Sequence, residues 1–117
     1  MKLLVCGGRN FTDRAKTYEV LDDYLSTTKS MNQPLEICHG NARGADTIAG
    51  EWAKERGVKC TVFPANWGEH GKAAGPIRNA QMLEVFQPDI VIAFAGGKGT
   101  LDMIKRTLKA RILVRAL

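Results

Sequence analysis

The chain has no long apolar run. No stretch of its 117 residues approaches the roughly 20 apolar residues of a membrane-spanning helix. The apolar start, Met1 to Cys6, stops at Gly7-Gly8, so it is too short for a secretion signal and predicts a first strand instead. We therefore expect a cytoplasmic protein with no membrane partner.

Cysteine is scarce and shows no pairing pattern. The three residues Cys6, Cys38 and Cys60 are odd in number and have no C-x-x-C spacing, which argues against a disulfide framework and a zinc site. Each lies in a strand-like apolar run, and we interpret them as buried free thiols of a reducing compartment. His39 follows Cys38, but neighbours in a strand point to opposite faces, so the pair does not predict a nucleophile with its base.

Motifs for metals and for the commonest nucleotide folds are also missing. No group of histidines and carboxylates has metal-ligand spacing, so we expect no resident metal and no required cofactor. A Mg²⁺ ion could still accompany the phosphates of a ligand. Gly97-Lys98-Gly99 lacks the third glycine of G-x-G-x-x-G, and no G-x-x-x-x-G-K-[ST] occurs, which argues against a P-loop NTPase.

The composition is that of one globular domain over residues 1–117, because 44% of the residues are hydrophobic and 25% are charged. The net charge of +5 favours an anionic partner: a nucleotide, a nucleic acid or an acidic protein. No block of like charges occurs, so a basic tail for nucleic acid is absent.

Apolar runs and helical periodicity alternate along the chain. Strands are predicted at Lys2–Cys6, Leu35–Cys38, Val58–Phe63, Asp89–Phe94 and Ile112–Val114. A first helix is predicted from Thr12 or Asp13 to about Thr28, and a second ends at Arg56 with Gly57 as a left-handed cap. A third helix is predicted to begin at Gly75-Pro76, and a fourth to run from near Gly99 to about Lys109. This order predicts an α/β fold, a three-layer α/β/α sandwich with a mostly parallel sheet of about five strands.

Helical spacing also predicts which faces are buried. The expected core faces are Tyr18, Leu21 and Leu25; Ala45, Ile48, Ala49, Trp52 and Ala53; Ile77, Ala80 and Leu83; and Leu101, Ile104 and Leu108. Pro64 to Gly75 is predicted to be an irregular loop, and its length suggests a functional role. In that loop, Trp67 either pins the segment to the body or stacks on an adenine.

Four strand exits carry glycines together with cations or polar side chains. The carboxyl ends of parallel strands meet at one sheet edge, where ligands of such folds bind. The last exit, Gly96 to Thr100, is a glycine-rich turn into a helix, and the free N–H groups of such a turn attract a phosphate. Arg43 and Arg78 are expected to pair with phosphate, and Asp46 either accepts a ribose hydroxyl or caps its helix. Thr100 either contacts the ligand or caps.

Together the four exits resemble the SLOG superfamily, which groups the cytokinin-activating Lonely Guy phosphoribohydrolases, the Smf/DprA proteins of DNA processing and the YpsA proteins. The likeness is greatest to the YspA, YpsA-related branch, with its G-G-R-[ND]-[FY], H-G-x-A-x-G-A-D, G-P-x-R-N and G-G-x-G-T motifs. These stand here at Gly7–Phe11, His39–Asp46, Gly75–Asn79 and Gly96–Thr100.

The resemblance implies a Rossmann-like fold that binds a nucleotide or a nucleotide-derived ligand, for example of the ADP-ribose type, and it suggests a homodimer. The ligand-binding residues it points to, together with the exits, are Gly7, Gly8, Arg9, Asn10, His39, Gly40, Arg43, Gly44, Asp46, Gly75, Arg78, Asn79, Gly96, Gly97, Lys98, Gly99 and Thr100. For His39, a hydrogen-bonded structural role is the favoured alternative.

Three functions compete at this point. The first is binding, by sensing or sequestering, of a nucleotide-derived ligand. The second is a phosphoribohydrolase-like enzyme, but Met103 stands where the Lonely Guy enzymes have their catalytic glutamate, so Asp46, Asp102 or Glu69 would have to supply the carboxylate. The third is DNA binding, which the basic balance suggests, although no basic run with interleaved aromatic residues occurs.

Overall fold

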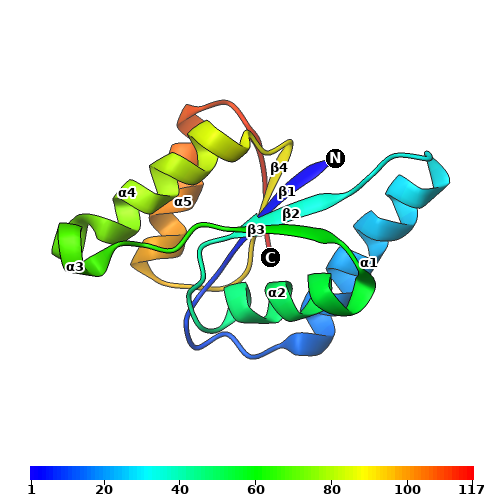
Figure 1. The fold of residues 1–117 in the computed structure, drawn as a ribbon, viewed down its shortest axis with the longest axis horizontal. Helices are drawn as coiled ribbons and strands as arrows, with labels where there is room; N and C mark the ends of the chain where they lie inside the picture. The colour runs from blue at the N-terminus through cyan, green and yellow to red at the C-terminus, as the bar shows by residue number, and fades with distance from the viewer.

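Strand β1 (Lys2–Cys6) forms the centre of a five-stranded parallel sheet in the order β3-β2-β1-β4-β5 (Figure 1). The computed structural model describes all residues, 1–117. The other strands are β2 (Glu36–His39), β3 (Lys59–Val62), β4 (Ile90–Ala93) and β5 (Leu113–Ala116). The helices are α1 (Arg14–Ser30), α2 (Ala45–Arg56), α3 (Trp67–His70), α4 (Ala74–Gln81) and α5 (Lys98–Lys109). This is the predicted Rossmann-like α/β fold.

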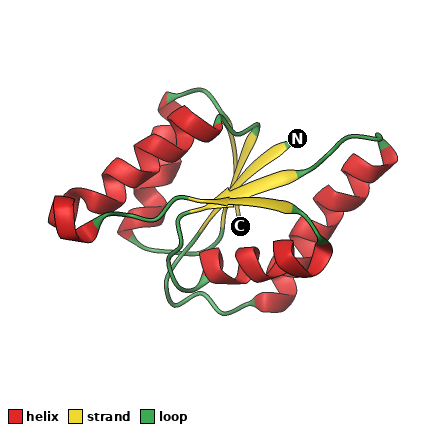
Figure 2. Cartoon of the chain, viewed as in Figure 1, coloured by secondary structure: helices red, strands yellow, loops and turns green.

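The alternation along β1 creates two cores, one on each face of the sheet. Leu3 and Val5 pack with residues of α1 and α2, whereas Leu4 between them packs with Met82, Phe86 and Met103 on the other face. Helices α1 and α2 therefore form one outer layer, and α3, α4 and α5 lie on the opposite side (Figure 2). None of the helices is long and apolar enough to cross a bilayer.

The first two helices follow the sequence pattern closely. The Asp13 side chain caps α1 by accepting a hydrogen bond from the Lys16 N–H at 3.0 Å, and Gly57 ends α2 in the left-handed conformation with φ of 68°. The predicted face of α2 is buried along its whole length. Trp52 is fully buried there, and its Nε1 donates to Asp22 Oδ1 at 2.8 Å.

The prediction of an irregular Pro64–Gly75 loop is wrong. The Asn66 side chain accepts from the Glu69 N–H at 3.1 Å and donates to Glu69 Oε2 at 2.9 Å, so this pair caps the short helix α3. A 3-10 turn over Gly71–Ala73 then leads into α4, which begins at Ala74, two residues before the predicted Pro76. A π-helical turn over Met82–Phe86 follows α4.

Two of the predicted core faces are wrong in part: Leu83 packs against the core and Ala80 and Ile104 are half-buried, but the other predicted residues of these faces are exposed. Ile77 on α4 is exposed, and the buried residues of that helix are Ala74 and Asn79. On α5, Leu101 and Leu108 are exposed, whereas Thr100, Met103 and Thr107 are buried. Thr107 tolerates burial because its hydroxyl finds a backbone acceptor: Thr107 Oγ1 donates to the Met103 carbonyl at 2.7 Å. The spacing of apolar residues therefore predicted the wrong buried residues, Leu101 and Leu108, on this helix.

The three cysteines are free, as predicted, but they are not equally buried. Cys38 is buried, whereas Cys6 and Cys60 are half-buried. Burial raises the pKa of Cys6 to about 12, so its thiol stays protonated at neutral pH and is a poor nucleophile.

Candidate functional site

A single large cleft lies at the carboxyl edge of the sheet, with a volume of about 1580 Å³. The exits of β1, β2, β3 and β4 all contribute to its lining, as parallel topology requires. Of the candidate ligand-binding residues, all except His39 and Gly44 line this cleft. Its volume exceeds the roughly 300–1,000 Å³ typical of small-molecule pockets, so the size of the cleft does not exclude a small-molecule ligand.

The N-terminus of α5 points its first amides at the cleft. The first backbone hydrogen bond that closes this helix runs from the Leu101 N–H to the Gly97 carbonyl at 3.0 Å. The N–H groups of Lys98, Gly99 and Thr100 donate to no acceptor of the protein. These donors and the positive end of the helix dipole favour an anion.

The glycines of this turn serve two different purposes. Gly96 allows close packing, because a Cβ there would overlap Thr100 Oγ1 and lie 2.6 Å from the Gly8 nitrogen. Gly97 and Gly99 have no protein atom within 4 Å of such a Cβ, and neither has a positive φ. The packing of the protein therefore does not require glycine at these two positions. Open space beside free amides is what a bound phosphate needs.

Gly97 is the N-cap of α5 and has no side chain, so the alternative in which Thr100 caps this helix is wrong. Thr100 lies in the first turn and is buried against Gly96. Gly44 is likewise the N-cap of α2, so the capping alternative for Asp46 is also wrong.

Backbone hydrogen bonds join the exit of β1 to the exits of β2 and β4. The Gly8 carbonyl accepts from the Ala45 N–H at 3.3 Å, and the Gly8 N–H donates to the Ala95 carbonyl at 2.9 Å. Gly44 has φ of 85°, and a Cβ there would overlap the Gly8 carbonyl oxygen and lie 2.8 Å from the Arg9 carbonyl carbon. Gly44 thus stands behind the cleft wall rather than in it, and its role in the structure is to let the two loops meet.

Asp46 is a carboxylate held inside the cleft wall. Only 5% of the residue is exposed, and its Oδ2 accepts from the N–H groups of Gly40 at 3.0 Å and Ala42 at 3.2 Å. Burial raises its pKa to about 6, although these two hydrogen bonds and the nearby Arg78 charge act in the opposite direction. A perturbed carboxyl in a cleft is typical of functional sites.

Arg78 and Asn79 connect the two sides of the cleft. Arg78 Nη1 donates to the Gly40 carbonyl, and its Nε donates to Asn79 Oδ1 at 3.1 Å. Asn79 is buried, and its Nδ2 donates to the Gly99 carbonyl at 3.2 Å and to Asp102 Oδ2 at 3.0 Å. This chain fixes α4 to the first turn of α5. Arg78 itself remains half-buried at the cleft, where it can reach an anion.

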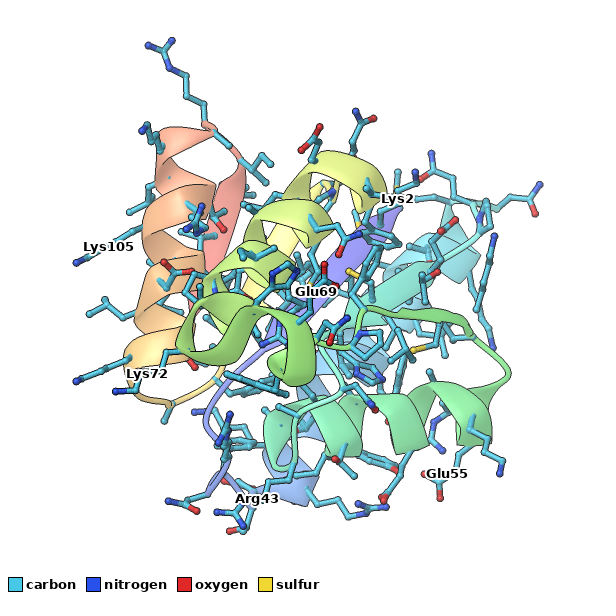
Figure 3. The ribbon with its side chains drawn as sticks, turned by 60° about the vertical axis from the view of Figure 1, so that its left-hand side comes forward. Lys2, Arg43, Glu55, Glu69, Lys72 and Lys105 are labelled. Atoms are coloured by element: carbon cyan, nitrogen blue, oxygen red, sulfur yellow. The ribbon has the colours of Figure 1, made fainter.

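The cations that line the cleft come from separate elements: Arg9, Arg43, Lys72, Arg78 and Lys98. Figure 3 shows Arg43 on the loop after β2 and Lys72 in the turn before α4, whereas Lys2 lies at the opposite end of β1. Arg43 Nη2 contacts Asn10 Oδ1 at 3.4 Å, and the Arg9 guanidinium lies over the Trp67 ring at 5.5 Å from its centroid.

Apart from Lys98, the cations of this cluster do not account for the net charge of +5. Residues 98–117 contain six cations and one acid, Asp102, so they account for the whole excess, and the remainder of the chain is neutral. Lys105, one of these cations, points away from the body on the outer side of α5 (Figure 3). The overall charge is therefore weak support for a ligand in the cleft; the local arrangement of donors is stronger.

His39 lies outside the cleft. It is buried, its Nδ1 accepts from the Asn41 N–H at 3.0 Å, and Gly50 makes room for its ring. Burial, with a contribution from the Arg78 charge, lowers its pKa, so the imidazole is neutral. These contacts fit the hydrogen-bonded structural role of His39 rather than a role in ligand binding.

The cleft also contains residues that were not predicted to bind the ligand; Met82 is one, and Asp102 was considered only as a candidate catalytic carboxylate. Met82 lines it from the end of α4, and Asp102 takes part in the Asn79 network and pairs with Arg106 Nε at 2.9 Å. The i,i+4 spacing of Asp102 and Arg106 was a usable signal for the second. Met82 offered none, because a methionine at helical spacing is indistinguishable from an ordinary core residue.

Comparison with known families identifies the family of the chain. A model of the "YspA, cpYpsA-related SLOG family" matches residues 1–70, which include the glycine loops after β1 and β2. The chain belongs to this SLOG family. The "Gene 61 protein" of Mycobacterium phage D29 is 35% identical over 120 residues, covering 97% of this chain and 93% of that protein. The likeness therefore extends beyond the matched segment to the loop after β4.

Among solved structures, the SLOG domain resembles the UDP-GlcNAc 2-epimerase from Neisseria meningitidis, whose structure was determined with bound UDP-GlcNAc. The two superpose with a TM-score of 0.61 over 100% of this chain and 32% of the epimerase chain, at 16% sequence identity. The chain thus spans about a third of that enzyme's length. The match establishes the Rossmann-like arrangement of strands and helices.

Proposed function

We propose that this SLOG domain binds a nucleotide or nucleotide-derived ligand in the cleft at the carboxyl edge of its sheet, and that the ligand's phosphate sits on the N-terminus of α5. The observation that carries the proposal is the pair of open glycines, Gly97 and Gly99, beside amides without protein partners. Phosphate is the common biological anion that exploits this combination.

The surrounding side chains suit the rest of such a ligand. Arg78 offers a half-buried guanidinium for a charged hydrogen bond to phosphate, worth about 1.5–3 kcal/mol. The Oδ1 atom of Asp46 accepts no hydrogen bond from the protein and is available for a ribose hydroxyl. A Mg²⁺ ion, if one binds, would be held by the ligand's phosphates.

Replacing Gly99 with alanine separates the ligand site from the fold. Alanine favours the helix by up to about 1 kcal/mol over glycine, so Gly99→Ala should be at least as stable as the wild type. Because Cα–Cβ bonds tilt toward the N-terminus of a helix, the added methyl group occupies the phosphate position. We expect affinity for AMP or ADP-ribose, measured by isothermal titration, to fall by about tenfold or more.

Gly68→Ala is the matched control, because Gly68 is also helical, a Cβ there would make only an ordinary contact of 3.8 Å with Asn66 Oδ1, and the residue does not line the cleft. It should leave affinity unchanged. If Gly99→Ala bound the same nucleotide as tightly as the wild type, the phosphate could not sit on α5.

A thermal-shift panel of nucleotides identifies the probe, since a ligand at 100 times its Kd stabilises the fold by about 2.7 kcal/mol.

Asp46 supports a second candidate, hydrolysis of an N-glycosidic bond. A carboxylate whose pKa is near 6 can accept a proton from a water as that water attacks the ribose carbon, and the departing base can then take up this proton. Glu69 is a poor choice for this role because it lies outside the cleft and bonds to Asn66. Free adenine released from AMP, and lost in Asp46→Asn or Asp102→Asn, would support hydrolysis; no release across a nucleotide panel would refute it.

A further inference from the structure

Trp67 is an exposed aromatic side chain in the wall of the cleft. It begins α3, a helix that buries no residue of its own, and 49% of its surface is exposed. The other tryptophan, Trp52, is fully buried. A tryptophan that served only to pin its segment to the body would bury its indole, as Trp52 does. About half of the residue is instead exposed, and Trp67 lines the cleft.

Arg9 holds the indole from the other side of the cleft wall. Its guanidinium lies 5.5 Å from the ring centroid, within the range of a cation–π contact, and Arg9 comes from the loop after β1. On α4, Gly75 approaches the ring edge, where a Cβ would stand 3.5 Å from the indole. The Arg9 guanidinium occupies one face of the ring and Gly75 lies at its edge, and about half of the residue still remains exposed.

We propose that the exposed surface of Trp67 is a stacking platform for the nucleobase of the ligand. This inference rests on the proposed function and deepens it: the site recognises a nucleotide, base included, rather than any phosphorylated sugar. Stacking of a base on an aromatic side chain contributes about 1–3 kcal/mol and accepts any base, because every base has a π-face. Phosphate on α5 and base on α3 would place the two ends of the ligand on two elements that line the same cleft.

AMP and ribose 5-phosphate are the probes that test this, because they share the sugar and phosphate and differ by the base. We expect AMP to bind about tenfold or more tightly than ribose 5-phosphate, and Trp67→Ala to abolish that difference without changing the affinity for ribose 5-phosphate. Trp67→Phe should keep most of the AMP affinity. Unfolding of each variant is measured alongside, and α3 has no buried residue whose packing would be lost.

Tryptophan fluorescence gives an independent readout. AMP should quench the wild-type emission through Trp67 and leave the emission of Trp67→Phe, which comes from the buried Trp52, unchanged. Equal affinities for AMP and ribose 5-phosphate, with no effect of Trp67→Ala, would overturn the platform while leaving the phosphate site on α5 standing. Binding of neither probe, nor of any larger nucleotide, would overturn the proposed function and this inference together.

Discussion

Replacing Asp46 with asparagine should stabilise the protein at pH 7 by about 2–3 kcal/mol. Burial raises the pKa of this carboxyl from 3.8 to about 6, so the folded state holds its proton more tightly than the unfolded chain does. The favourable contribution of Asp46 is therefore fully present below pH 3.8 and is lost as the pH rises through 6. Asparagine keeps an oxygen for the Gly40 and Ala42 N–H groups but carries no charge to bury.

The measurement is urea unfolding of both proteins between pH 4 and pH 8. The stabilising effect of Asp46→Asn should be largest at pH 7 and above, and should shrink toward zero near pH 4. Asp46→Ala is the control: it removes the acceptor of two buried N–H groups and should destabilise at every pH. An asparagine variant that is less stable than the wild type by the same amount throughout this range would contradict the raised pKa.

This prediction bears on function as well as stability. A buried carboxylate that destabilises the fold at neutral pH is expected where its charge has a function that asparagine cannot perform. The two roles considered for Asp46, accepting a ribose hydroxyl and activating water, both place that charge beside the ligand.

Gly44→Ala should cost about 3–5 kcal/mol of stability, one of the largest effects of any single methyl group in this chain. The residue has φ of 85°, and its Cβ would overlap the Gly8 carbonyl oxygen, which is backbone and cannot rotate away. Gly57→Ala is a matched control because Gly57 has φ of 68° but no atom within 4 Å of a Cβ. That variant bears only the strain of the left-handed conformation, about 1–2 kcal/mol.

Thermal or urea unfolding of the two variants isolates the contact between the loops. Equal costs at Gly44 and Gly57 would mean that the exits of β1 and β2 do not meet as described, and the wall of the cleft would then be built differently. A much larger cost at Gly44 would support the backbone approach that brings Arg9, Asn10 and Arg43 to one side of the site.

The sheet was predictable because its strands are short apolar runs separated by helices, a pattern with few topological solutions. The convergence of the four exits then followed from parallel pairing alone, which is why the loops after β1, β2 and β4 were recognised together. The sequence did not reveal which residues within those loops line the cleft. His39 and Gly44 share the motif of Asp46, yet one packs against Gly50 and the other under Gly8.

The errors have physical causes. Leu101 and Leu108 were assigned to the core of α5 on hydrophobicity, but that helix turns Thr100 and Thr107 inward, one packed on Gly96 and the other bonded to a backbone carbonyl. Helix α3 was overlooked because its Asn66–Glu69 cap is polar and it buries nothing. Local hydrogen bonds explain why Thr107 is buried and why α3 forms, and the spacing of apolar residues does not reveal such bonds.

The central claim, that phosphate rests on the N-terminus of α5, is tested most directly by following the backbone amides of the ¹⁵N-labelled protein by NMR during titration with AMP. The account predicts the largest shifts at Gly97, Lys98, Gly99 and Thr100, accompanied by a shift of the Trp67 indole N–H if the base stacks there. AMP that binds while these four amides remain unmoved would contradict the account and place the nucleotide elsewhere on the protein.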